Sequence, residues 1–97
     1  MILRLVQMQF ELSRTSEFLE VFAIHRKALS EFPGCLKIEL LRDINDPGRF
    51  STLSHWDSAQ HLEDYRQSDL FKLVWQKVKP MFRDKAQAFS METISFD

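Results

Sequence analysis

The fold is decided by residues 49–82, RFSTLSHWDSAQHLEDYRQSDLFKLVWQKVKPMF. Their pattern predicts a strand ending at Trp56, a sharp turn into a short helix, and a second helix with a broad apolar face. Asp57 and Gln60 are expected to form a capping box at the start of the short helix. Most polar aromatic groups able to do chemistry lie in this stretch: His55, Trp56, Tyr65 and Trp75.

A further strand is predicted just before this stretch, at residues 35–42, CLKIELLR. The connection DINDPG at residues 43–48 is too short for a parallel crossover. The strand at 35–42 therefore pairs with residues 49–56 as an antiparallel hairpin. Pro47 and Gly48 suit the centre of a type II turn.

Both ends of the chain also predict strands, at residues 2–12 and at residues 86–97. One face of the first strand is nearly all apolar and suits packing beneath helices. The other face is half apolar and suits a wet cavity or a subunit interface. It carries Leu3, Leu5, Gln7, Gln9 and Glu11.

A helix is predicted between the first two strands. Hydroxyl groups within residues 13–16, SRTS, are able to cap its start, and Pro33-Gly34 ends it. His25 falls near the centre of its apolar stripe, so it should be partly buried. Its role is either that of a core histidine satisfied by one hydrogen bond or that of a residue lining a pocket. The stripe comprises Phe18, Val21, Phe22, His25, Ala28, Leu29 and Phe32.

The predicted order is β-α-β-β-α-α-β, which is the ferredoxin-like, split βαβ plan of the α+β class with its second helix broken in two. It gives a four-stranded antiparallel sheet with helices on one face, and residues 1–97 form a single domain. The open face of the sheet is too apolar to be left bare. A homodimer with the two sheets face to face would cover it.

Composition excludes several classes of function. The net charge is −1 with the signs interspersed, which leaves no basic footprint for nucleic acid or an anionic membrane. Cys35 is the single cysteine, so an internal disulfide and a multi-cysteine metal site are excluded. It is either a small buried residue at a strand start or a reactive thiol. Without a secretory signal or an apolar run of membrane-spanning length, we expect a cytoplasmic protein.

Residues 32–74, FPGCLKIELLRDINDPGRFSTLSHWDSAQHLEDYRQSDLFKLV, carry a family resemblance. The features are the P-G-C before the second strand, the L-L-R-D…D-P-x-R-F hairpin, the strand-ending Trp56 with its acidic cap, and the L…Y…S-x-x-F-K run. In these the chain resembles the antibiotic biosynthesis monooxygenase (ABM) domain family over essentially its whole length. The motifs are specific for the fold, because they are mostly turn, cap and core residues.

The resemblance implies a dimeric α+β barrel in which each protomer holds a pocket between its sheet and its helices. Several members oxidise activated phenols or hydroquinones with dioxygen and neither metal nor flavin. The resemblance therefore predicts a cofactor-independent monooxygenase-like homodimer that binds a small phenolic or quinol-type aromatic and dioxygen. The alternatives are a non-catalytic small-ligand-binding or stress-associated dimer of the same fold and, third, haem binding or degradation.

Cofactor-free oxygenation needs an aromatic pocket, a base near neutral pKa and a donor to the oxyanion. His25 or His55 is the candidate base, because imidazole titrates closest to physiological pH. Gln7, Gln9, Tyr65 or Arg4 are candidate donors. The candidate pocket walls are Trp56, Tyr65, Phe71, Trp75 and Phe89.

Each candidate also has a structural alternative. Trp56 at a strand end also suits a packing anchor, and Trp75 on a helical stripe also suits the core or an interface. His55 alternates with Leu53 and must share its face of the sheet, but the pattern leaves open which face that is.

Haem degradation is disfavoured by three positions. Haem-degrading relatives use an asparagine on the first strand, a tryptophan on the short helix and a histidine on the second helix as iron ligand. The matching positions here hold Gln7, Tyr65 and Trp75. An indole N–H is a donor only and does not ligate iron.

Overall fold

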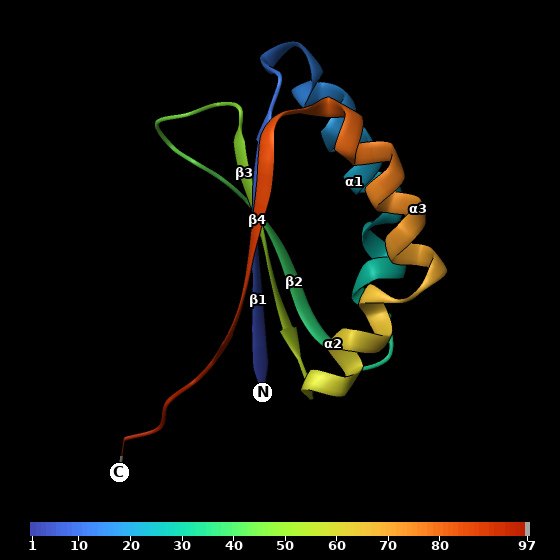
Figure 1. The fold of residues 1–97 in the computed structure, drawn as a ribbon, viewed down its shortest axis with the longest axis vertical. Coiled ribbons are helices and arrows are strands. Elements are labelled where there is room, and N and C mark those ends of the chain that lie inside the picture. The colour runs from blue at the N-terminus through green and yellow to red at the C-terminus, as the bar shows by residue number, and fades with distance from the viewer. Residues whose placement is uncertain (97) are drawn as a thin grey trace.

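The computed structural model describes residues 1–96 and shows one sheet backed by helices (Figure 1). The chain order is that of the predicted ferredoxin-like plan, which is confirmed. The elements are β1 (Ile2–Phe10), α1 (Thr15–Ser30), β2 (Cys35–Arg42), β3 (Arg49–Trp56), α2 (Ala59–Arg66), α3 (Asp69–Val78) and β4 (Phe82–Glu92). Short 3₁₀ turns at Leu12–Arg14 and Lys79–Met81 precede α1 and β4.

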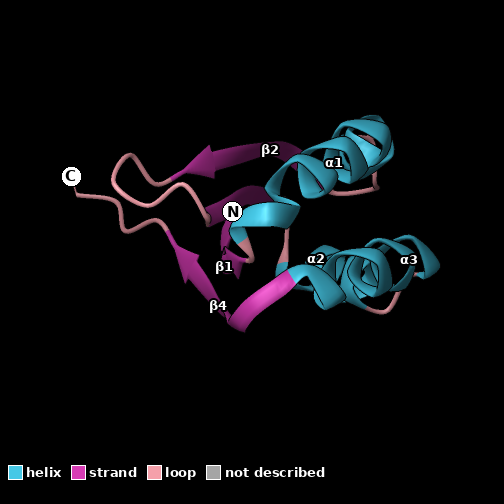
Figure 2. Ribbon diagram, turned by 90° about the horizontal axis from the view of Figure 1, so that it is seen from above, coloured by secondary structure: helices cyan, strands magenta, loops and turns pink. Residues whose placement is uncertain are grey.

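The sheet has the strand order β2-β3-β1-β4, and every neighbouring pair is antiparallel. All helices lie on one side of it, with α1 on the β2 side and α2 and α3 on the β4 side (Figure 2). The predicted bounds of β2 and β3 are confirmed. β1 ends at Phe10 rather than at residue 12, and β4 begins at Phe82 because that residue pairs with Phe10.

The core lies between the sheet and the helices and is built around phenylalanines. Phe10 is fully buried and stacks on Phe18 of α1, with ring centroids 4.1 Å apart. Phe50 meets both rings edge-on, at 5.8 and 5.3 Å. Burying each such ring stabilises the fold by about 1.5–3 kcal/mol, so this cluster holds α1 against the sheet.

The hairpin between β2 and β3 is closed by carboxylates. The Arg49 N–H donates to the Asp46 carbonyl over 3.1 Å, and the Asp46 carboxylate accepts from the Gly48 N–H over 3.0 Å. The expected type II turn is wrong, because within residues 1–96 only Gly34 has a positive φ and a type II turn needs one at Gly48. Gly48 is required for another reason: a Cβ there would lie 2.9 Å from the Phe10 carbonyl oxygen.

The caps of the helices also differ from expectation. Ser58, not Asp57, caps α2, and its Oγ accepts from the His61 backbone N–H over 3.2 Å. Gln60 donates to Asp64 over 2.8 Å, so it does not reach back to complete a capping box. A hydroxyl one residue closer to the helix therefore takes the place of the carboxylate.

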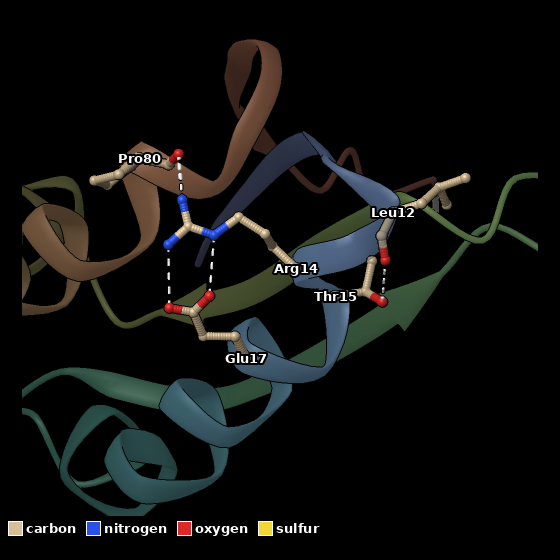
Figure 3. Close-up of polar contacts among 5 residues, drawn as sticks. All are labelled: Leu12, Arg14, Thr15, Glu17 and Pro80. Atoms are coloured by element: carbon tan, nitrogen blue, oxygen red, sulfur yellow. Dashed lines mark hydrogen bonds and ion pairs between the residues drawn. The ribbon is translucent and has the colours of Figure 1, made fainter.

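At the start of α1, by contrast, no side chain caps the helix, and the Thr15 hydroxyl donates backward to the Leu12 carbonyl over 3.2 Å. Arg14 joins this end of α1 to the turn before β4 (Figure 3). Its guanidinium donates to the Pro80 carbonyl over 2.9 Å and grips both Glu17 carboxylate oxygens at 3.0 and 3.1 Å. One side chain thus connects two segments far apart in the sequence.

Candidate functional site

The pairing register decides which side chains face the helices. β1 and β3 pair Ile2 with Trp56, Leu3 with His55 and Leu5 with Leu53. Directly opposed residues share a face of the sheet, and successive residues alternate between faces. The face toward the helices, here the helix face, carries the even-numbered residues of β1 and β3. The opposite side, here the open face, carries Leu3, Leu5, Gln7, Gln9, Arg49, Ser51, Leu53, His55, Gln87, Phe89 and Met91.

A cavity of about 80 Å³ lies between the helix face and the helices α1, α2 and α3. Its walls are almost wholly apolar. The polar side chains that reach it are Thr52, Ser54 and Tyr65. The complete lining is Val6, Met8, Phe18, Phe22, Leu29, Ile38, Thr52, Ser54, Tyr65, Phe71, Val74, Trp75 and Val78.

One wall of the cavity is a continuous run of aromatic rings contributed by α2 and α3. Tyr65 and Phe71 meet edge to face at 5.3 Å, and Phe71 lies parallel to Trp75 at 5.9 Å with 9° between the planes. Helical spacing puts these three residues on inward-facing positions, which is why the sequence singled them out. The wall is suited to contact with a flat ring.

Trp56 supports this wall from behind rather than lining the cavity. It is 1% exposed and stacks on Tyr65 with centroids 5.0 Å apart. Its indole N–H donates to the Ser54 hydroxyl over 2.9 Å, which satisfies the polar end of a buried ring. Trp56 therefore occupies the packing role and orients Tyr65.

Tyr65 supplies a neutral hydroxyl to the cavity. Burial, with a smaller contribution from the neighbouring Cys35, raises the pKa of Tyr65 to about 12. Within residues 1–96 the hydroxyl makes no hydrogen bond to protein, so its proton is free to be donated to a ligand. At physiological pH the hydroxyl is therefore protonated and able to donate a hydrogen bond.

The two candidate bases lie outside the cavity. His55 stands on the open face between Leu3 and Lys37, across the sheet from the cavity. His25 is half-buried at the seam between α1 and α3, with its Nε2 3.3 Å from the Lys77 Nζ. The sequence led us to expect a histidine base and the aromatic walls in the same pocket. In the structure neither imidazole lines the aromatic cavity.

The expected glutamines and Phe89 are likewise on the open face. Gln9 is 7% exposed and holds the hairpin, donating to Asp46 over 3.3 Å and accepting from Arg49 over 3.2 Å. Gln7 borders a separate polar hollow of about 300 Å³. Phe89 pairs with Leu5 and is 45% exposed. The sheet itself separates these three residues from Tyr65 and the other cavity residues.

Arg4, a candidate oxyanion donor, lies on the helix face but outside the cavity lining. Its Nη1 donates to the Ser90 hydroxyl over 2.9 Å. Burial, together with the nearby Arg66 charge, lowers the pKa of the Arg4 guanidinium. Arg4 thus flanks the β1 end of the cavity without reaching its interior.

Thr52 and Ser54 are cavity residues that sequence reasoning missed. The signal was present, because they alternate with Phe50 and Trp56 on one strand and so share their buried face. If Phe50 or Trp56 is assigned to the core, the hydroxyls of Thr52 and Ser54 must also lie beneath the helices. Thr52 gives the apolar cavity a further hydroxyl for hydrogen bonding, whereas the Ser54 hydroxyl is engaged by the Trp56 N–H and the Arg4 carbonyl.

No group of three or more His, Cys, Asp or Glu side chains within residues 1–96 is arranged to hold a metal ion. No helix among those residues is both long enough and apolar enough to cross a membrane.

These observations define an α+β protein of ferredoxin-like topology with an aromatic cavity between its two layers. The sequence profile of the family described as antibiotic biosynthesis monooxygenase matches residues 1–77. The chain belongs to this ABM family.

Solved structures share the fold at low sequence identity. An antibiotic biosynthesis monooxygenase crystal structure superposes with a TM-score of 0.91 at 18% identity, covering 98% of this chain and 100% of the other. Rv0793 from Mycobacterium tuberculosis gives 0.88 at 10% identity, with 98% and 96% covered. A mutant of SnoaB, a cofactor-independent oxygenase from Streptomyces nogalater, gives 0.83 at 12% identity, with 98% and 94% covered. No curated protein sequence matches the chain significantly.

Proposed function

We propose that the protein is a cofactor-independent monooxygenase that takes a small phenolic or quinol-type aromatic into the cavity between sheet and helices. The observation that carries the proposal is the aromatic cavity with the neutral Tyr65 hydroxyl in its wall. Membership of the ABM family and the shared fold with SnoaB support the same class of reaction.

In this reaction the substrate itself is the reductant. Its anion passes one electron to dioxygen, and the resulting radical pair joins to form a carbon–oxygen bond. The peroxide anion formed in this way takes up a proton, and the resulting hydroperoxide loses water, so that overall a CH₂ group and O₂ become C=O and H₂O. The protein stacks the ring, excludes water and donates the Tyr65 proton in a hydrogen bond to the substrate oxyanion.

Deprotonation is assigned to the substrate's own acidity rather than to a cavity base. His25 and His55, the bases expected from the sequence, stand outside the cavity lining. A substrate with an activated, acidic position loses this proton to bulk water and enters the cavity as its anion. The hydroxyls of Tyr65 and Thr52 then stabilise the negative charge.

A non-catalytic ligand-binding or stress-associated protein is the second candidate. The observation that favours it is the same lack of a carboxylate or imidazole among the cavity residues. Binding without turnover needs only the aromatic wall and the hydroxyls. Haem is poorly accommodated, because Trp75 occupies the position where haem-degrading relatives place the ligating histidine, and no histidine lines the cavity.

We further propose that a second copy of the chain covers the open face, forming a dimeric α+β barrel. Leu3, Leu5 and Leu53 lie there beside Phe89 and Met91, which are 45% and 43% exposed. Contiguous apolar surface of this kind marks an interface. A cytoplasmic location for the dimer stays a prediction.

The dimer is tested by light scattering after size exclusion. The wild type should be dimeric at micromolar concentration, and Leu5→Glu should be monomeric because it buries a charge in the interface. Leu73→Glu is the matched control, since Leu73 lies on α3 and is 45% exposed. A monomeric wild type would contradict the barrel.

The reaction is tested by oxygen uptake with anthrone and a panel of hydroquinones in the presence of a chelator. Uptake should persist with the chelator and fall by about 10²–10³-fold in Tyr65→Phe, the loss typical of one oxyanion donor. Ligand-induced thermal stabilisation without oxygen uptake would instead support the second candidate. If none of these aromatics produces thermal stabilisation or oxygen uptake, both candidate functions are contradicted.

A further inference from the structure

Trp75 separates the cavity from a second hollow on the outside of the protein. This outer groove has a volume of about 450 Å³ and lies between the end of α3 and the start of β4. Its lining is Trp75, Lys79, Phe82, Asp84, Lys85 and Ala86. Trp75 belongs to both linings, so a movement of its ring would join the groove to the cavity.

The indole contacts one aromatic ring that lines the cavity, Phe71, and one that lines the groove, Phe82. It stacks on Phe71 and meets Phe82 edge-on at 5.5 Å. The cavity behind it is about 80 Å³, well below the roughly 300–1,000 Å³ of ligand pockets in general. A ring of naphthalene size therefore needs the space that Trp75 would open, and part of the ligand would remain in the groove.

The groove has an excess of positive charge. Among residues 1–96, neither the Lys79 nor the Lys85 ammonium lies within 4.0 Å of a carboxylate. The one acid in the lining, Asp84, is paired with the Arg83 Nε at 3.5 Å. Lys79 and Lys85 thus border the groove without a partner of opposite charge, and Lys85 also borders the polar hollow on the open face.

The backbone of β4 is irregular at the same place. Its register with β1 shifts between Gln7 and Gln9 and again between Gln9 and Phe10, whose partners lie within residues 82–87 of β4. Such bulges re-aim side chains and occur beside functional sites more often than elsewhere. Asp84 and Lys85, from this irregular segment, both line the groove.

Resting on the function proposed above, we propose that the substrate is an aromatic with a carboxylate substituent. Its ring passes Trp75 into the cavity, and its carboxylate lies in the groove between Lys79 and Lys85. The competing entrance is a groove beside α1 and β2, which shares Phe22 and Ile38 with the cavity. Within residues 1–96 its one cation, Arg26, is in no ion pair, and its Glu39 is paired with Lys37 at 3.4 Å. It therefore offers an anion one free cation, where the outer groove offers two.

A matched pair of probes tests this assignment. Naphthoate and naphthamide have the same ring and differ in charge, and their dissociation constants are measured by tryptophan fluorescence at low and high salt. The wild type should prefer naphthoate by roughly 3- to 30-fold, the sum of two exposed ion pairs. The preference should shrink at high salt.

The double variant Lys79→Gln, Lys85→Gln should lose the preference for naphthoate and bind naphthamide as before. Lys72→Gln is the matched control, because Lys72 is exposed on α3 and outside the groove. An unchanged preference in the double variant, or one abolished by Arg26→Gln in the competing groove, would overturn the assignment.

The proposed function fails separately from this inference. Equal, salt-independent binding of both probes, together with oxygen uptake from anthrone, would overturn the carboxylate class and leave the oxygenase standing. If the wild type binds neither probe and also does not oxidise anthrone, both the carboxylate class and the oxygenase function are overturned.

Discussion

Tyr65 should titrate far above an ordinary tyrosine, and the chain contains no other tyrosine to obscure the measurement. Burial raises its pKa from 10.0 to about 12 in the folded protein. The tyrosinate absorption band, followed against pH, should therefore have its midpoint near 12 in buffer and near 10 in urea. A midpoint near 10 in the folded protein would refute the account of Tyr65 as a largely buried side chain.

The same shift makes stability depend on pH with a definite sign. Because the folded pKa lies above the unfolded one, the contribution of Tyr65 is fully present below pH 10 and is lost as the pH rises toward 12. At pH 11 the unfolded state has gained about 1.4 kcal/mol from ionising and the folded state almost nothing. The total loss on reaching full ionisation is about 2.7 kcal/mol.

Tyr65→Phe isolates this effect from the titration of lysines. Urea unfolding of both proteins should give nearly equal free energies at pH 8, because the hydroxyl makes no bond that the variant loses. At pH 11 the wild type should have fallen by about 1.4 kcal/mol more than the variant. Parallel pH profiles for the two proteins would show that the hydroxyl is solvated.

Three further predictions concern the frame around the site. Gly34→Ala should lower the free energy of unfolding by at least about 1–2 kcal/mol, because φ is 86° and a Cβ would clash with the Cβ and ring of His61. His61→Gly removes all of these atoms, so Gly34→Ala should cost less in the His61→Gly background than in the wild type. Ser54→Ala should cost about 1–3 kcal/mol in urea unfolding by leaving the buried Trp56 N–H without its acceptor, and an unchanged midpoint would contradict that bond. The Gly48 N–H holds the pKa of the Asp46 carboxyl below its usual range. The ionised Asp46 carboxylate therefore stabilises the fold fully above about pH 4, and this stabilisation is lost as the pH falls through the lowered pKa of the folded state. Asp46→Asn should flatten this acid limb of the stability profile, and an identical limb in the variant would count against the contact.

The sheet was readable from the sequence where local pattern decides it. Residues 35–42 and 49–56 alternate in polarity on either side of a short polar loop, so their bounds and antiparallel pairing were predicted correctly. The turn type was not, because Pro47-Gly48 alone suggests type II. Contacts of the Asp43 and Asp46 carboxylates with backbone N–H groups set the conformation instead.

The site was harder to read, because it depends on contacts between distant segments. Alternation grouped His55 with Leu53, but only the pairing of His55 with Leu3 shows that both are on the open face. Gln9 has the chemistry of an oxyanion donor, yet its amide is taken up by Asp46 and Arg49. Partners more than 35 residues away along the chain decide both outcomes, and no local pattern reports them.

The central claim is that aromatic oxidation takes place in the cavity between sheet and helices. The direct measurement is oxygen uptake from anthrone, with chelator present, by the wild type, Val74→Phe and Leu73→Phe. Val74 lines the cavity and its neighbour Leu73 is 45% exposed, so the two variants add the same ring inside and outside it. We predict an uptake rate at least about tenfold lower in Val74→Phe, because a displaced substrate loses its reactive geometry, and a wild-type rate in Leu73→Phe. Equal rates in all three proteins, or no uptake beyond the uncatalysed reaction, would contradict the claim.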